Sequence, residues 1–146
     1  MLTLATNLWD HTEVPTARFI TTNGAVRYDG ACVMGRGCAR QAIERIPGIN
    51  YTLGRKIKQA GNHVHQLDVY DGAPVYSFPV KHHWKDNADL ELITRSAEEA
   101  MRELTLDRAL LPRPGCGNGH LHWQQVHAVI ADLLDDRFYV IDYTRS

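Results

Sequence analysis

The feature that most constrains the fold is the alternation of short apolar runs with segments of helical spacing. Residues 18–22 and 108–111 are predicted strands, and each is followed by a glycine-rich stretch and then by a helix-like segment. Such alternation predicts an α/β sandwich with a mixed, mainly parallel sheet between layers of helices. Because the carboxyl ends of parallel strands meet at one edge, the glycine-rich stretches 23–37 and 112–122 are expected to lie together, where ligands of such folds bind.

The other elements follow the same periodicities. Further strands are expected at residues 2–6, 64–69, 75–80 and 138–142. Helices are expected at residues 37–46, 51–60, 88–104 and 123–134. Asp71 and Gly72 form a candidate hairpin turn, and Asp86 and Asn87 are candidate caps of the third helix. A chain of this length suits a single domain over residues 1–146.

Composition narrows the class of protein. The formal net charge of −1 argues against a dedicated duplex-binding protein, although an enzyme acting on one nucleotide needs only a local basic patch. The three cysteines, Cys32, Cys38 and Cys116, argue against a disulfide framework because their number is odd. No apolar run is long enough to cross a bilayer and no signal peptide is apparent, so a cytoplasmic protein without a membrane partner is expected.

Histidines raise the question of a metal. The candidate metal ligands are four histidines and one cysteine: His63, His65, His120, His122 and Cys116. No pair of them has the i, i+4 helical spacing or the Cys-x-x-Cys spacing that metal sites use. The sequence therefore predicts neither a metal site nor a cofactor.

The two glycine-rich loops suggest an anion site. MGRGCA at residues 34–39 and GCGNGH at residues 115–120 each lead into a predicted helix. Converging backbone N–H groups at a helix N-terminus attract a phosphate, so two such loops facing each other can grip a diphosphate. Each loop alone is equally compatible with a plain strand-to-helix turn. A dinucleotide fingerprint is disfavoured because Arg40 stands where its third glycine belongs, and the lysine of a phosphate-binding loop is missing.

Three segments, in order along nearly the whole chain, carry a family resemblance. ITTN at residues 20–23 with VMGRGCA at residues 33–39 resembles the first signature of macrodomains. LPRPGCGNGHLHW at residues 111–123 resembles the second, and SFPVKHHW at residues 77–84 resembles a segment of the DarG-type antitoxin macrodomains. The resemblance implies ADP-ribose binding and hydrolysis of the bond between the distal ribose and its acceptor, as in DarG-type DNA ADP-ribosyl glycohydrolases and the terminal ADP-ribose protein glycohydrolase.

The resemblance also implies roles for particular residues. Lys81 matches the lysine on which this branch depends, and Asn23 would approach the distal ribose, so these two are the candidate catalytic residues. Asn7, in place of the usual aspartate, and Leu8 would bind the adenine, with Tyr143 lying against it. The diphosphate would lie between two sets of loop residues: Gly35, Arg36, Gly37 and Cys38 on one side, and Gly115, Cys116, Gly117, Asn118, Gly119 and His120 on the other.

Two features of the loops remain open on sequence alone. Gly119 stands where the protein glycohydrolase has an acidic residue, which favours the DNA-directed branch. His120 is either an acid or base within the loop or a helix-start residue that contacts phosphate or solvent. The candidate nucleic-acid contacts are four consecutive residues: His82, His83, Trp84 and Lys85. Trp84 can stack on a base or pack in the core. The basic side chains around it can contact nucleic acid or form a solvated loop.

The expected function is therefore removal of ADP-ribose from nucleic acid, with DNA as the expected acceptor. Two alternatives stay open: a phosphatase acting on ADP-ribose 1″-phosphate, and a non-catalytic ADP-ribose reader. The expected partners are ADP-ribose, ADP-ribosylated DNA and an ADP-ribosyltransferase toxin, and the chain is expected to be a monomer.

Overall fold

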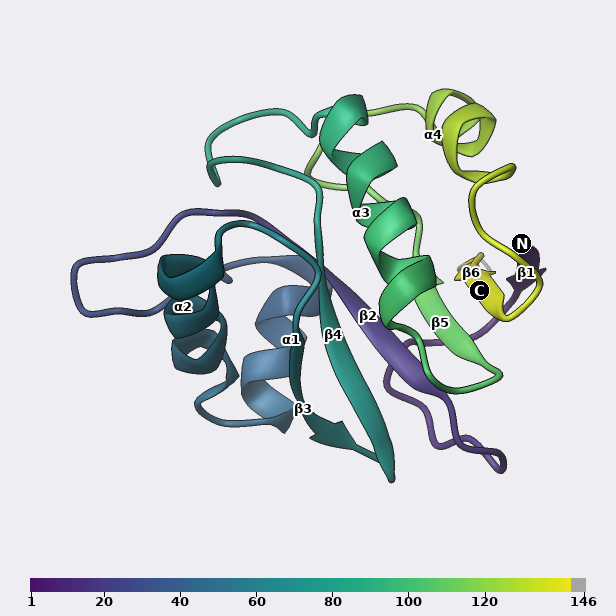
Figure 1. Cartoon of the computed structure of the whole chain (residues 1–146), viewed down its shortest axis with the longest axis horizontal. Coiled ribbons are helices and arrows are strands. Elements are labelled where there is room, and N and C mark those ends of the chain that lie inside the picture. Colours follow the sequence, from purple (N-terminus) through teal and green to yellow (C-terminus); the bar gives the residue numbers. More distant parts are fainter. Residues whose placement is uncertain (143–146) are drawn as a thin grey trace.

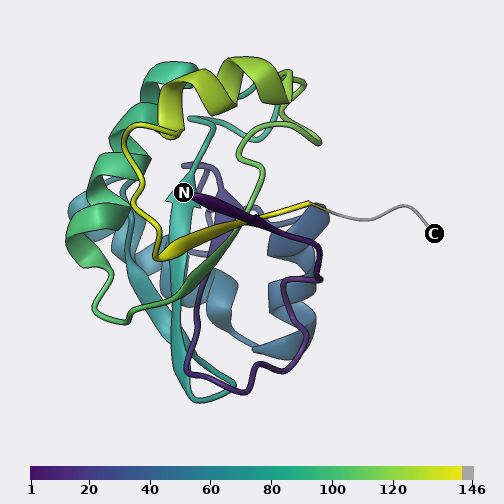
Figure 2. The ribbon, with the colours of Figure 1, turned by 90° about the vertical axis from the view of Figure 1, so that its right-hand side faces the viewer.

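The computed structural model describes residues 1–142, and Tyr143 lies outside them. Its centre is a six-stranded sheet in the order β1-β6-β5-β2-β4-β3. The strands are β1 (Leu2–Leu4), β2 (Ala17–Thr22), β3 (Gln66–Tyr70), β4 (Ala73–Pro79), β5 (Ala109–Pro112) and β6 (Phe138–Ile141). Neighbouring strands are parallel except that β3 runs antiparallel to β4. β1 and β6, far apart in sequence, lie side by side at one edge (Figure 2).

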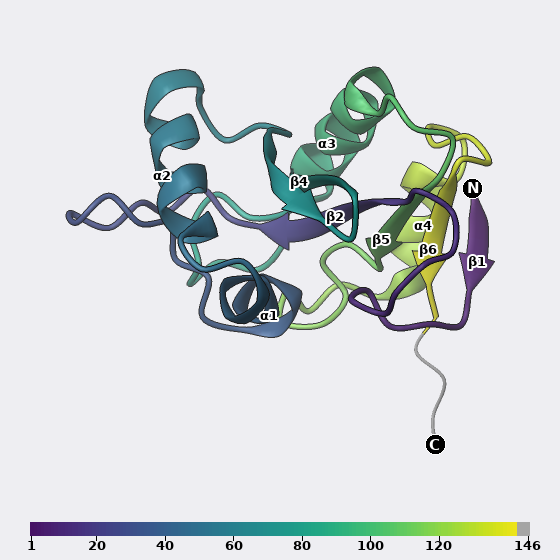
Figure 3. The ribbon, with the colours of Figure 1, turned by 90° about the horizontal axis from the view of Figure 1, so that it is seen from below.

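Helices cover both faces of this sheet. α1 (Gly37–Arg45) and α2 (Ile49–Ala60) pack on one face, and α3 (Leu90–Glu103) and α4 (Trp123–Ile130) pack on the other (Figures 1 and 3). The strands supply both cores because side chains alternate across a sheet. In β2, Phe19 joins the core beneath α3 and α4, while Ile20 joins the core beneath α1 and α2. The predicted three-layer α/β sandwich with a mixed, mainly parallel sheet is confirmed.

A buried arginine ties the N-terminal loop to the sheet. Arg18 of β2 is fully buried, and its Nε donates a hydrogen bond to the Leu8 carbonyl at 2.7 Å. Its Nη2 donates to the Asp10 carbonyl at 2.6 Å and pairs with the carboxylate of Asp71 at 3.4 Å. Asp71 and Gly72, both with positive φ, form the predicted turn between β3 and β4. The loop after β1 is thereby fixed to the end of the sheet that bears this turn.

Two details of the predicted helices are wrong. The cap of α3 is Asp89, whose carboxylate accepts a hydrogen bond from the Glu91 N–H at 3.0 Å, and not Asp86 or Asn87. Asp89 has the extended backbone that a cap needs immediately before the first helical residue. α4 ends at Ile130 rather than at residue 134, because the chain passes into turns while still burying Leu134. No helix among residues 1–142 is both long and apolar enough to cross a membrane.

Candidate functional site

A cavity of about 870 Å³ opens at the carboxyl ends of β2, β4 and β5. Its wall comes from the ends of these strands and from parts of the segments that follow them: residues 21–23 and 33–39, and residues within 80–87 and 112–120. The parallel arrangement brings the two glycine-rich loops to this one edge, as predicted. The volume falls within the range of roughly 300–1,000 Å³ that is usual for sites that enclose a small molecule or cofactor.

Asn23 shapes the first loop from within the cavity wall. Its Nδ2 donates a hydrogen bond to the Val33 carbonyl at 2.8 Å, and its Oδ1 accepts one from the Ala25 N–H at 2.9 Å. The two hydrogen bonds join the start and the end of the excursion between β2 and the glycine-rich stretch. Asn23 therefore holds the loop in place, and its amide is largely occupied within the chain.

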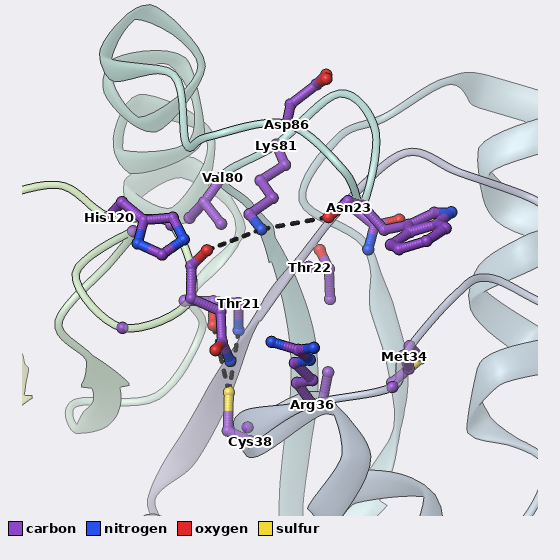
Figure 4. Close-up of a pocket in the computed structure, with 18 of the residues that line it drawn as sticks. Thr21, Thr22, Asn23, Met34, Arg36, Cys38, Val80, Lys81, Asp86 and His120 are labelled. Atoms are coloured by element: carbon purple, nitrogen blue, oxygen red, sulfur yellow. Dashed lines mark hydrogen bonds between the residues drawn. The ribbon is translucent and has the colours of Figure 1, made fainter.

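The glycine-rich stretch ends at the N-terminus of α1. Arg36 occupies the capping position without capping the helix through its side chain, and the first turn of α1 holds no acidic residue. The first N–H groups of the helix are thus left for an anion, which the helix dipole also attracts. Figure 4 shows the Arg36 side chain directed into the cavity across from Lys81. This corner of the site is positively charged and suits a phosphate group.

The second loop depends on two glycines. Gly115 has a φ of 73°, and a Cβ there would lie 2.8 Å from the Cβ of Ala88. A Cβ on Gly119 would meet the Gly115 carbonyl and would lie 2.7 Å from the same Ala88 atom. His120 follows with a φ of 64°, a conformation in which a side chain is uncommon. The loop therefore folds back tightly against the start of α3.

Lys81 lies between the loops. Its Nζ donates a hydrogen bond to the Asn118 carbonyl at 3.0 Å and a longer one to the Trp84 carbonyl at 3.4 Å (Figure 4). Lys81 and the residues of both acceptors line the cavity, so the ammonium group lies at the cavity wall. The predicted catalytic lysine and the predicted diphosphate loops are thus parts of one site.

The two loop cysteines are held as neutral thiols. Burial raises the pKa of Cys38 and of Cys116 above the ordinary thiol value. The Sγ of Cys38 accepts a hydrogen bond from the Thr21 N–H at 3.4 Å, which fixes the start of α1 to the end of β2. Since the thiolate is the reactive form of cysteine, this geometry assigns both thiols to packing.

Only two of the four residues in the basic segment 82–85 line the cavity. Trp84 and Lys85 line the cavity, with the Trp84 side chain 47% exposed and the Lys85 Nζ 5.3 Å from the centre of its ring. His82 and His83 are not among the residues that line it. The ring of His82 instead bonds to Asp89 at 2.8 Å, and this hydrogen bond lowers the pKa of the Asp89 carboxyl. His83 stacks on Trp84 with ring centres 5.7 Å apart.

Asn7 and Leu8 do not line the main cavity. They border a separate hollow of about 180 Å³ together with Trp9 and the α1 residues Gln41 and Arg45. Leu8 is almost fully buried, and its carbonyl already accepts the hydrogen bond from Arg18. Asn7 and Leu8, predicted to bind the adenine, thus border a different hollow from the one that Lys81 lines, and Tyr143 is outside the described residues.

Several residues that line the cavity were not among the predicted site residues, and Thr22 and Arg113 are two of them. The Thr22 hydroxyl is buried in the wall without a hydrogen-bond partner among residues 1–142. Arg113 lies over the ring of Trp123 at 4.8 Å and pairs with Asp142 at 3.2 Å. Both lie within the quoted motifs, Thr22 directly before Asn23 and Arg113 two residues before the second loop. Their positions at strand ends were the available signal.

Comparison with known sequences gives a partial match. No protein-family model matches the chain. A Thermus aquaticus protein named DNA ADP-ribosyl glycohydrolase is 29% identical over 133 residues, which cover 84% of this chain and 35% of that protein. The chain thus spans about a third of the length of this relative.

Solved structures match over a larger part of the chain. The macrodomain of Thermus aquaticus DarG superposes with a TM-score of 0.72 at 27% identity, and the match covers 99% of both chains. The structure of Thermosipho africanus DarTG in complex with ADP-ribose superposes with a TM-score of 0.68 at 19% identity, over 87% of this chain and 38% of that one. At this identity the second likeness concerns the fold.

Proposed function

Because the chain is a macrodomain of the DarG type, we propose that it binds ADP-ribose in the main cavity and releases it from nucleic acid. The reaction is hydrolysis of the bond that joins C1″ of the distal ribose to the acceptor, with a DNA base as the acceptor. The observation that carries the proposal is the position of Lys81. Its ammonium group lies at the wall of a single cavity that both glycine-rich loops also line.

The diphosphate is assigned to the space between the loops. On one side, the first turn of α1 presents backbone N–H groups with no acidic residue in competition, and Arg36 adds a cation. On the other side, the glycines of the second loop allow the backbone to approach a ligand without side chains in between. A dianionic group suits this space because the N-terminus of α1 and Arg36 attract it on one side and the glycines leave room for it on the other.

The distal ribose is assigned to the space near Lys81. A diphosphate held between the loops places the attached sugar beside the ends of β2 and β4, where Asn23 and Lys81 line the wall. Lys81 then acts at C1″ by attack of its amine or by stabilising charge on the departing group. Fixing the ribose beside one amine supplies the proximity on which either route depends.

The acceptor is assigned to the outer wall of the cavity. Trp84 exposes an aromatic face beside the cationic Lys85, and a flat ring next to a positive charge suits a base and its phosphate. The Thermus aquaticus relative supports this assignment through its name, and the ADP-ribose in the Thermosipho africanus structure supports the choice of nucleotide. Pairing with an ADP-ribosyltransferase toxin is part of the same proposal.

The proposal is tested with an oligodeoxynucleotide that carries ADP-ribose on one base. Incubation with the protein should yield free ADP-ribose and the unmodified oligonucleotide, separated by chromatography. ADP-ribose 1″-phosphate and an ADP-ribosylated protein serve as parallel substrates. Release of phosphate alone would instead establish a phosphatase, and calorimetric binding of ADP-ribose without turnover of any substrate would establish a reader.

A further inference from the structure

The loop from Gly115 to Leu121 holds His120 in an unusual conformation. His120 has a φ of 64°, and among residues 1–142 Asp71 is the only other non-glycine residue with a positive φ. The conformation is imposed from both sides. Gly119 has no room for a side chain, and the Leu121 N–H donates a hydrogen bond to the Gly115 carbonyl at 2.9 Å. A side chain in this conformation costs free energy that glycine would not cost.

The imidazole of His120 is directed into the cavity and not into the core. It lines the same wall as Lys81, and Figure 4 shows its ring beside the space that the Lys81 side chain enters. The Lys81 Nζ bonds to the carbonyl of Asn118, only two residues before His120. The ring is exposed and makes no hydrogen bond within residues 1–142. A substrate in the cavity therefore finds both of its nitrogen atoms accessible.

The other ionisable groups of the cavity are poorly suited to proton transfer. Arginine and lysine are weak proton donors as side-chain types, which applies to Arg36, Lys85 and Arg113. Lys81 is already assigned to C1″. The Cys38 and Cys116 thiols are held neutral by burial. The carboxylate of Asp86 is directed away from the Lys81 amine (Figure 4). Of the eight histidines in the sequence, only His120 lines the cavity.

We propose that His120 is a further catalytic residue, the general acid that protonates the acceptor as its bond to C1″ breaks. The inference rests on the proposed function and specifies its chemistry. When the bond between C1″ and the acceptor atom breaks, the electron pair stays on the acceptor atom, and the imidazolium proton moves to it. A water molecule then supplies hydroxide to C1″ and returns a proton to the imidazole. The sum is ADP-ribose, the unmodified acceptor and an unchanged His120.

The variant His120→Gly removes the imidazole without straining the backbone, because glycine adopts a positive φ readily. The variant should keep the unfolding temperature of the wild-type protein and bind ADP-ribose with near wild-type affinity. Its rate of ADP-ribose release from the modified oligonucleotide should fall by about 100-fold, the lower end of the usual contribution of a general acid. His127→Ala is the matched control, since His127 is exposed on α4 and does not line the cavity.

Two further readouts separate chemistry from positioning. Imidazole added to the buffer should restore part of the lost rate in His120→Gly, because it can occupy the space of the missing ring. The pH–rate profile of the variant should also differ from that of wild type, because the group assigned to supply the proton is missing.

The outcomes distinguish the two proposals. Undiminished release by His120→Gly would overturn the role of His120 and leave the proposed function standing. A slower variant that shows no rescue by imidazole and the same pH dependence as wild type would overturn it equally. Absence of release by the wild-type protein would overturn the proposed function and the role of His120 together.

Discussion

The ammonium group of Lys81 donates a hydrogen bond to the carbonyl of Asn118 at 3.0 Å, which joins the segment after β4 to the loop after β5. A second hydrogen bond joins the same two segments, from the Ala88 N–H to the Gly119 carbonyl at 3.0 Å. The amine is thus oriented by backbone atoms before any substrate enters. Such preorganisation suits a group that has to meet one sugar carbon.

Replacement of Lys81 by alanine should reduce ADP-ribose release from modified DNA by at least about 100-fold, because the amine assigned to C1″ is removed. Binding of free ADP-ribose should change little, since the diphosphate is held by the two loops. Calorimetry and a single-turnover assay measure the two quantities separately. Lys58→Ala, on the exposed face of α2, is the control. Unchanged turnover in Lys81→Ala would rule out the assignment.

Gly119→Ala should destabilise the protein by roughly 1–3 kcal/mol and weaken ADP-ribose binding, because the added methyl group collides with the Gly115 carbonyl and with Ala88. Thermal unfolding compares it with Gly117→Ala, where a Cβ meets no atom of the protein within 4 Å. Equal unfolding temperatures for the two variants would show that the second loop is not as tightly folded as described.

Trp84→Ala should raise the KM for DNA-linked ADP-ribose by about 10-fold through the loss of base stacking. The affinity for free ADP-ribose should be nearly unchanged, since the indole is assigned to the acceptor. The Trp84 backbone carbonyl that Lys81 bonds to remains in the variant. Tyr51→Ala removes another exposed aromatic residue, on α2, and should alter neither quantity. A parallel loss of affinity for free ADP-ribose would assign Trp84 to the nucleotide instead.

Acid should weaken the fold through Asp71. Hydrogen bonds from the Thr12 N–H, at 3.0 Å, and from His11 hold the pKa of its carboxyl at about 2, below the ordinary value of 3.8. The unfolded chain therefore takes up this proton first as the pH falls. The stabilisation is complete above pH 3.8 and is lost as the pH falls through about 2.

Denaturant titrations at a series of pH values measure this effect. Asp71→Asn should be less stable than wild type near neutral pH, because Arg18 loses its charged partner. Its stability should decline less steeply between pH 4 and pH 2. Asp132→Asn alters an exposed aspartate beyond α4 and should follow the wild-type curve. Parallel curves for Asp71→Asn and wild type would contradict the role given to this carboxylate.

Much of the fold followed from periodicity and turn chemistry. Alternating strands and helices predict the parallel arrangement, and that arrangement alone places Gly35 and Gly117 at one edge of the sheet. Lys81 could be placed at the same edge because its segment directly follows a strand. These inferences succeed because they depend on local patterns and on the rule that parallel strands end together.

Details that depend on tertiary contacts could not be predicted from the sequence. Three residues before α3 are suitable caps by type: Asp86, Asn87 and Asp89. In the structure Asp89 caps the helix and also bonds to the ring of His82, a contact that residue type does not reveal. Asn7 follows β1 as predicted, but the packing of the N-terminal loop places it in a separate hollow. Composition offered no signal for the side-chain orientation of His82, which turns to a carboxylate instead of the cavity.

The central claim is that one cavity holds the diphosphate between two loops and presents the distal ribose to Lys81. The most direct test is a crystal structure of the protein with ADP-ribose. We expect the diphosphate between residues 34–38 and 115–120, with C1″ about 3.5 Å from the Lys81 Nζ. Nucleotide bound elsewhere, or a distal ribose turned away from the amine, would contradict it.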